Sequence, residues 1–202
     1  MAASVLAVMA HPDDAELWAG GTLAHHAHTG AQVTIAVPRH EPERDAEATA
    51  GAAILGADLR LLDHLTVPAV RDLLDQVRPE VVITHRIDDV HPDHRHAATT
   101  LLSALPEVVI TTGCPRRVYT CDTYNSLTLI GPVHASVIID ITDTYDVKMR
   151  ALQAHASQPI TDHFGPMAEH LARLWGARIG SPHAEAFTPV PVLGRIPATT
   201  YL

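Results

Sequence analysis

Two short groups of histidine and aspartate residues stand out in this sequence as candidates for metal chemistry. The first comprises residues 11–14 (His-Pro-Asp-Asp), and the second comprises residues 91–94 (His-Pro-Asp-His). A catalytic zinc ion takes three protein ligands, through imidazole nitrogen or carboxylate oxygen, and keeps a further position open for water. His11, Asp14 and His94 would supply two nitrogens and one oxygen to such an ion.

The other members of the two groups suit the steps around a metal-activated water. Asp13 would stay unliganded but close, and a carboxylate in that position is a natural general base. His91 would protonate a leaving amine or stabilise an oxyanion, and Asp93 would orient a ligating histidine. Taken singly, each group is equally compatible with a helix N-cap or a turn. Their joint placement at two strand ends favours a functional site.

The apolar pattern around these groups predicts the fold that brings them together. Residues 4–10 form a continuous apolar run, which is typical of a strand buried on both faces of a parallel sheet. Strands and helices alternate, which predicts an α/β fold: a Rossmann-like, doubly wound, mostly parallel sheet with helices on both faces. In the strand order 3-2-1-4-5 the first and fourth strands are neighbours, so both groups face one crevice. The expected strands are 4–10, 31–37, 58–62 and 80–84, and the expected helices are 15–29, 43–55, 67–77 and 94–104.

The second half of the chain is less regular. Pro79–Thr84 and Pro106–Thr111 both read PEVVIT, which we interpret as coincidence because nothing else in the period repeats. No linker or low-complexity tract interrupts the chain, so we expect a single domain over residues 1–202. Further strands are expected at 117–122 and 136–140, helices at 142–155 and 167–179, and an extended tail that wraps the surface at 188–202.

Composition limits the classes of function. Hydrophobic residues make up 47% of the 202 residues, which is enough for a buried core, and the net charge of −9 disfavours nucleic-acid binding. No apolar run approaches the ~20 residues of a membrane-spanning helix. The first ten residues lack the basic residues of a signal peptide. Two cysteines, Cys114 and Cys121, cannot build a disulfide framework, so we expect a cytoplasmic protein with neither a membrane nor a nucleic-acid partner.

Several motifs, taken in order, resemble the LmbE-like (PIG-L) family of metal-dependent N-deacetylases. They span nearly the whole chain, and the ordered set is far more specific than any single member. The motifs are AHPDDAEL at 10–17, Arg44-x-x-Glu47 on a helix that ends in Leu55-Gly56, HPDH at 91–94, the stretch from Asp140-Ile141-Thr142 through Lys148 and His155 to Ser157-Gln158, and AEAF at 184–187.

This resemblance implies an enzyme that removes the acetyl group from an N-acetylglucosamine-type amino sugar in a small-molecule conjugate. It implies one divalent metal, with zinc expected and ferrous iron as the alternative that the same ligands accept. Relatives often assemble as homo-oligomers. The residue roles that the resemblance implies are His11, Asp14 and His94 as metal ligands, Asp13 as general base, His91 as acid or oxyanion partner, Asp93 as a tuning residue, and Arg44 as a contact to a substrate hydroxyl.

The sequence departs from the family pattern in three places. The loop at 38–43 is short, Ala15 stands where many relatives have an acid, and His183 replaces a tyrosine that some relatives use near the oxyanion. His183 is therefore a candidate substrate-binding residue or a surface residue. Other amide hydrolysis, hydration of a carbon–carbon double bond, and non-catalytic metal or sugar binding remain alternative functions. Asp13 argues against the last, because a binding site gains nothing from a free carboxylate beside the metal.

Overall fold

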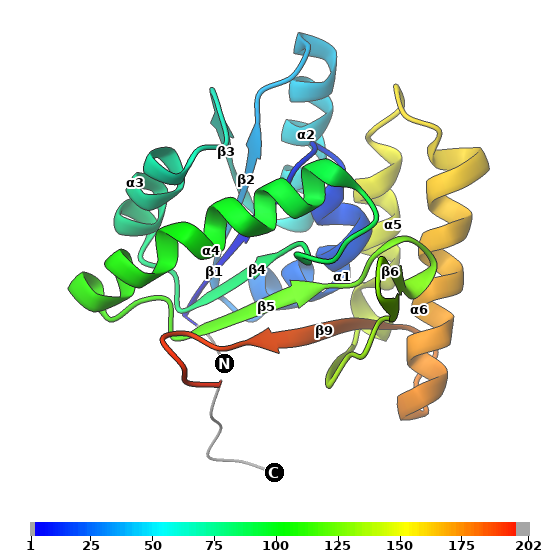
Figure 1. Cartoon of the computed structure of the whole chain (residues 1–202). Helices are drawn as coiled ribbons and strands as arrows, with labels where there is room; N and C mark the ends of the chain where they lie inside the picture. Colours follow the sequence, from blue (N-terminus) through cyan, green and yellow to red (C-terminus); the bar gives the residue numbers. More distant parts are fainter. Residues whose placement is uncertain (1–2, 197–202) are drawn as a thin grey trace.

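A computed structural model of the chain describes residues 3–196. A seven-stranded sheet with the order β3-β2-β1-β4-β5-β9-β8 forms its centre, and the first five strands of this order are parallel (Figure 1). The predicted α/β fold and the predicted 3-2-1-4-5 strand order are thus confirmed. The strands are β1 Ser4–Val8, β2 Gln32–Pro38, β3 Asp58–Leu62, β4 Val81–Thr84, β5 Arg117–Cys121, β8 Val137–Asp140 and β9 Ala184–Val190, with a small separate hairpin of β6 Leu127–Thr128 and β7 Gly131–Pro132.

Helices cover both faces of the sheet because alternate residues of the central strands are buried on opposite sides. In β1, Val5 and Ala7 pack with α1, α2, α5 and α6, whereas Leu6 and Val8 pack with α3 and α4. Among residues 3–196, no helix combines the length and the apolarity needed to cross a membrane. The helices are α1 Asp14–His28, α2 Pro42–Leu55, α3 Val67–Val77, α4 Pro92–Thr112, α5 Tyr145–Gln153 and α6 Gly165–Ile179.

The repeated hexapeptide PEVVIT adopts two different structures. Its first copy contributes Val81–Thr84 to β4, where every residue is buried between two neighbouring strands. Its second copy lies in the last turns of α4, which runs to Thr112 rather than ending at the predicted residue 104. In the second copy, Val108 continues the buried helical stripe of α4, while Ile110 is 72% exposed. Tertiary surroundings therefore decide the structure of this segment, not its own propensity.

The second half of the chain corrects two other predictions and adds a π-helical turn. The helix predicted at 142–155 is a 3₁₀ turn, Thr142–Thr144, followed by the shorter α5. A π-helical turn, Ile160–Phe164, precedes α6. The tail predicted to start at residue 188 instead shares its first residues with β9, an inner strand antiparallel to both β5 and β8. Residues 197–202 of that tail lie outside the described residues.

Lys148 of α5 and Glu185 of β9 form a buried ion pair that contacts the middle of α1. Each residue belongs to one of the family-like motifs. The Glu185 carboxylate accepts hydrogen bonds from the backbone amides of Gly21 and Thr22, at 3.0 and 2.8 Å. The Lys148 ammonium donates to Glu185 at 2.6 Å and to the Leu17 carbonyl at 2.9 Å. This pair therefore satisfies backbone groups of α1 and fixes the helix that carries Asp14.

Glu185→Gln is expected to lower the free energy of unfolding by about 3–5 kcal/mol, because it leaves the Lys148 ammonium buried without a counter-charge. Urea unfolding followed by circular dichroism measures the loss. The matched control is Glu169→Gln, which removes an exposed pair with Arg173 and is expected to cost no more than about 0.5 kcal/mol. A Glu185→Gln protein as stable as the parent would contradict this account.

Candidate metal centre

The two His/Asp groups meet at the carboxyl edge of the sheet because β1 and β4 are parallel neighbours that end together, with Val8 opposite Thr84. The chain leaves β1 through His11 and enters α1 at Asp14, while His94 lies in the first turn of α4. Asp14 Oδ2 lies 3.1 Å from His11 Nδ1, and Asp14 Oδ1 lies 3.3 Å from His94 Nε2. The three predicted metal ligands therefore lie together, although they are 83 positions apart at the extremes of the sequence (94 − 11).

His94 has the environment of a metal ligand. The Asp89 carboxylate accepts the Nδ1 hydrogen of the fully buried ring at 3.1 Å, so Nε2 is the ring nitrogen that can offer a lone pair to a metal. This Nε2 atom makes no hydrogen bond to any residue from 3 to 196. A carboxylate behind one ring nitrogen and a free lone pair on the other is the usual arrangement of a ligating histidine. Burial opposes protonation of the ring, but Asp14 and Asp89 raise the pKa of His94 to about 10, so these two carboxylates stabilise positive charge on the ring.

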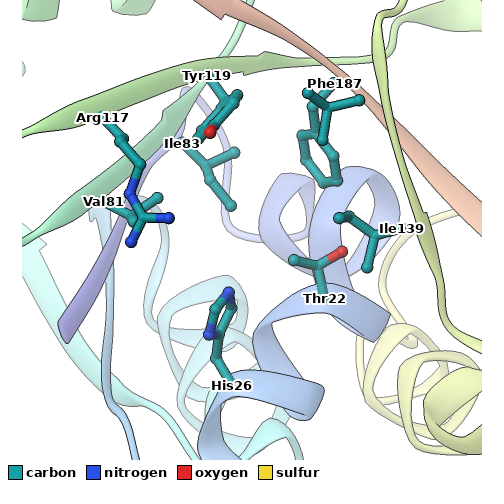
Figure 2. Close-up of a pocket in the computed structure, with 9 residues that line it drawn as sticks. Thr22, His26, Val81, Ile83, Arg117, Tyr119, Ile139 and Phe187 are labelled. Carbon is teal, nitrogen blue, oxygen red and sulfur yellow. The ribbon is translucent and has the colours of Figure 1, made fainter. Parts of the chain in front are cut away.

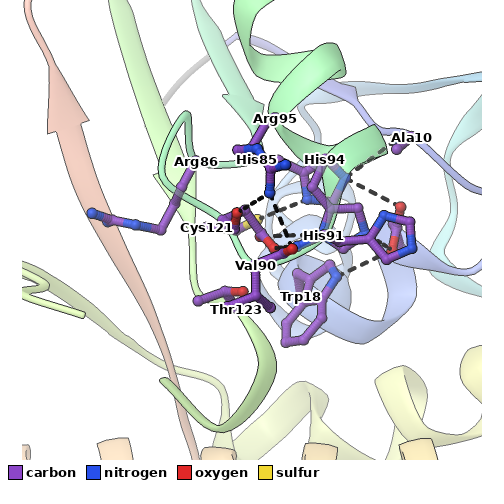
Figure 3. A network of polar contacts seen from close by, with 12 residues as sticks. Ala10, Trp18, His85, Arg86, Val90, His91, His94, Arg95, Cys121 and Thr123 are labelled. Carbon is purple, nitrogen blue, oxygen red and sulfur yellow. Dashed lines mark hydrogen bonds and ion pairs between the residues drawn. The ribbon is translucent and has the colours of Figure 1, made fainter. Parts of the chain in front are cut away.

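His85 joins the centre at the end of β4 (Figure 3). Its Nε2 accepts the Ala10 amide hydrogen at 3.2 Å, and Asp14 Oδ2 lies 3.1 Å from the same nitrogen. Burial lowers the pKa of His85, and the charge of Asp14 opposes this decrease. Asp14 Oδ2 thus lies 3.1 Å from one nitrogen of His11 and 3.1 Å from one nitrogen of His85.

The available donor atoms thus fit a divalent cation. Within the described part of the chain, two sets of three side chains bring one donor atom each to within 4.8 Å of one another, and His94 belongs to both. Although burial works against ionisation, the imidazoles of His85 and His94 hold the pKa of Asp14 well below its usual range. The two sets are His11, His91 and His94, and Asp14, His85 and His94.

Asp13 is buried beside this centre and is not used as a helix cap. It occupies the N-cap position of α1, yet its side chain makes no capping hydrogen bond with any described residue. Instead, Asp13 Oδ1 accepts a hydrogen bond from Arg44 at 2.9 Å. Burial and the neighbouring Asp14 raise the pKa of Asp13, and Arg44 opposes that rise. The helix-cap explanation for this aspartate therefore fails.

His91 and Asp93 border the centre on its exposed side. The His91 ring lies edge-on to His11, at 4.9 Å between centroids, and 4.7 Å from His94. His91 Nδ1 accepts the Asp93 amide hydrogen at 3.2 Å, which leaves the ring hydrogen on Nε2. Burial, His94 and His11 lower the pKa of His91. Asp93 Oδ2 lies 3.3 Å from His11 Nε2, so Asp93 contacts a candidate ligand as expected.

The two candidate substrate residues, Arg44 and His183, lie in different surroundings. Arg44 points to Asp13, so in this structure its partner is a residue of the centre itself. His183 is not brought to the centre: its ring stacks on Tyr145 at 3.7 Å, and its charged neighbours belong to α5, α6 and the end of β8. Its position just before β9, two strands beyond β4 in the sheet, accounts for this separation.

A family model matches the part of the chain that contains most of these residues. Residues 6–105 match the family described as "PIG-L: GlcNAc-PI de-N-acetylase", a range that contains every candidate site residue except His183. The chain belongs to the PIG-L family.

Curated relatives of this PIG-L member are deacetylases. It is 30% identical over 97 residues to the probable N-acetyl-alpha-D-glucosaminyl L-malate deacetylase 2 of Bacillus subtilis (strain 168), covering 48% of the chain and 42% of that protein. It is 25% identical over 232 aligned positions to the 1D-myo-inositol 2-acetamido-2-deoxy-alpha-D-glucopyranoside deacetylase of Salinispora arenicola (strain CNS-205), covering 76% of the chain and 75% of that protein. The chain thus spans less than half the length of the first of these relatives.

Solved structures share the fold over nearly the whole chain. The 4-carboxy-2-hydroxymuconate hydratase GalB of Pseudomonas putida KT2440 has a TM-score of 0.79 at 22% identity, with 98% of each chain covered. The N,N'-diacetylchitobiose deacetylase of Pyrococcus horikoshii has a TM-score of 0.76 at 21% identity, covering 95% of this chain and 85% of that one. These likenesses extend the family fold beyond residue 105.

Three residues of this PIG-L centre are missing from the sequence prediction. Trp18 donates its indole hydrogen to Asp14 Oδ1 at 3.2 Å, and Asp89 holds His94. The Tyr124 ring stacks on His94, with 5.7 Å between centroids and 10° between planes. The i,i+4 spacing of Asp14 and Trp18 on one helix was a usable signal. Tyr124 follows β5, the next strand after β4, so the strand-end rule also points to it.

An open cleft adjoins His11. It has a volume of about 520 Å³ and is formed by the segments that follow β2 and β3 together with the start of α4. The short loop after β2 contributes Arg39 and His40, and Arg39 is already paired with Asp63 at 3.1 Å. The cleft reaches the His/Asp centre at His11 and Asp93.

Proposed function

We propose that this chain is a metal-dependent hydrolase that removes the acetyl group from an N-acetylglucosamine-type amino sugar within a small-molecule conjugate. The observation that carries the proposal is the arrangement of His94, whose unpaired Nε2 faces Asp14, next to a buried Asp13 that does not cap its helix. The family and the deacetylase relatives support the same chemistry.

His11, Asp14 and His94 would hold the metal, with His85 as a further nearby donor. Zinc is the expected ion, and ferrous iron is the alternative that these ligand types accept. When bound, such an ion acts as a Lewis acid and lowers the pKa of a bound water from 15.7 towards about 7.

The chain's own side chains would move the protons. Asp13, oriented by Arg44, takes a proton from the attacking water, and the water oxygen bonds to the amide carbonyl carbon. A neutral His91 with its hydrogen on Nε2 donates a hydrogen bond to the oxyanion, which favours the oxyanion role over the acid role. The carbon–nitrogen bond then breaks, and Asp13 returns its proton to the nitrogen. The products are a free amine and acetate.

The test is a panel of N-acetylated amino-sugar conjugates incubated with metal-loaded protein and assayed for free amine and acetate. We expect release that stops on treatment with a chelator and returns on addition of Zn²⁺ or Fe²⁺, because the proposed hydrolysis depends on a metal that lowers the pKa of water. A parallel assay follows the loss of the double bond of an unsaturated dicarboxylate. Hydration without acetate release would replace the proposal with the hydratase alternative, and metal binding without any turnover would replace it with the binder.

A further inference from the structure

A second cavity lies at the other end of α1 from the metal centre, between that helix and the strands β4, β5, β8 and β9 (Figure 2). Its volume is about 200 Å³, and its apolar walls are Val81, Ile83, Val137, Ile139 and Phe187. For comparison, a cavity of about 150 Å³ lined by similar side chains binds benzene. An aromatic ring with one or two small substituents therefore fits this space.

Polar groups converge on this otherwise apolar cavity. Thr22 is 5% exposed, and its hydroxyl makes no hydrogen bond to any residue in the range 3–196. Helical threonines often bond the carbonyl one turn earlier, so an unused buried hydroxyl calls for another partner. Nδ1 of His26 likewise has no partner within the described residues. The Tyr119 hydroxyl also points into the cavity (Figure 2).

The mouth of the cavity carries more basic than acidic groups, in a chain whose net charge is −9. Arg117 lines the cavity and donates to Glu80 at 2.6 Å, and Arg116 also acts on Glu80. His26 faces Arg117 across the mouth (Figure 2). One carboxylate therefore faces two arginines and an imidazole, which leaves positive charge for an anionic group of a ligand.

We propose that this cavity is a binding site for a small hydroxyaryl carboxylate. The ring packs against the apolar walls, the carboxylate lies at the mouth near Arg117 and His26, and the ligand hydroxyl bonds the unpartnered hydroxyl of Thr22. None of these residues belongs to the metal centre, so the site is independent of the proposed deacetylation.

The probes are 4-hydroxyphenylacetate, phenylacetate and benzyl alcohol, titrated into metal-loaded and chelator-treated protein by calorimetry and by NMR. We expect saturable binding of 4-hydroxyphenylacetate with a Kd of about 1 mM or tighter. Phenylacetate is expected to bind several-fold more weakly because Thr22 keeps no partner, and benzyl alcohol more weakly still because Arg117 gains no anion. Chelation is expected to leave all three affinities unchanged.

Two variants test the location. Val137→Trp fills the cavity from an edge strand and is expected to abolish binding. Thr22→Val keeps the side-chain shape and is expected to remove the preference for 4-hydroxyphenylacetate over phenylacetate. No saturable binding up to about 10 mM, binding that survives Val137→Trp in folded protein, or binding lost only on chelation would each overturn the proposal.

Discussion

Asp13→Asn is expected to lower kcat by about 10²- to 10⁴-fold while leaving the metal content unchanged. Asparagine keeps the shape of the side chain and keeps an oxygen for Arg44, which lies 2.9 Å from Asp13 Oδ1, but it cannot accept a proton from water. Acetate release and bound metal, measured on the same preparation, separate loss of the base from loss of the metal.

Two further variants test whether the loss of turnover is specific to the ionised Asp13 carboxylate. Asp58→Asn changes an exposed aspartate of β3 and is expected to leave kcat unchanged. Arg44→Gln removes the cation that opposes the raised pKa of Asp13, so that pKa rises further. Because the base works only when ionised, the acidic limb of the pH–kcat profile should move to higher pH. Wild-type turnover in Asp13→Asn, or an acidic limb that moves to lower pH in Arg44→Gln, would contradict the role of Asp13.

The sequence predicts those features of the metal centre that depend on the order and direction of the strands. The buried runs of β1 and β4 predict parallel neighbours, and parallel neighbours bring the residues after each strand to one edge. This reasoning places His11, Asp14 and His94 together without any knowledge of side-chain packing. The observed contacts of Asp14 with both histidines agree with it.

The residues that the sequence did not predict depend on tertiary contacts. Asp89 lies in the loop before the second group, where nothing in the local pattern distinguishes it from Asp88. Tyr124 reaches His94 because the buried carboxylate of Asp122 holds the turn after β5, where it accepts hydrogen bonds from Ser126 and from the Trp175 indole. Asn125 and Ser126 in this turn have positive φ angles, and the hydrogen bond from Ser126 to Asp122 helps to hold this backbone.

Tertiary contacts also explain why the predictions for the second half of the chain were wrong. The second PEVVIT copy becomes helix because Leu101, Leu105 and Val108 form one buried stripe against α3 and the sheet. The AEAF segment becomes an inner strand because Glu185 satisfies α1 while Ala184 and Ala186 pack beside Trp175. Local propensity predicts neither structure, and both depend on tertiary contacts with residues far away in the chain.

His94→Ala is expected to abolish metal binding, whereas Asp89→Asn is expected to weaken it by about 10- to 100-fold. His94 supplies the one buried Nε2 that belongs to both sets of donor atoms, so its loss removes a ligand outright. Asp89 accepts the Nδ1 hydrogen of His94 at 3.1 Å, which keeps Nε2 facing the centre, and its other oxygen accepts the His91 amide hydrogen at 2.8 Å. Competition with a chromophoric chelator measures both affinities for Zn²⁺.

His170→Ala is the matched control, because this histidine is exposed on α6 and lies outside both donor sets. Its metal content and affinity are expected to equal those of the parent protein. An Asp89→Asn protein that binds Zn²⁺ as tightly as the parent would show that the carboxylate does not orient His94. A His94→Ala protein that retains one tightly bound ion would show that the cation lies elsewhere, and the proposed deacetylation would then lose the centre on which it depends.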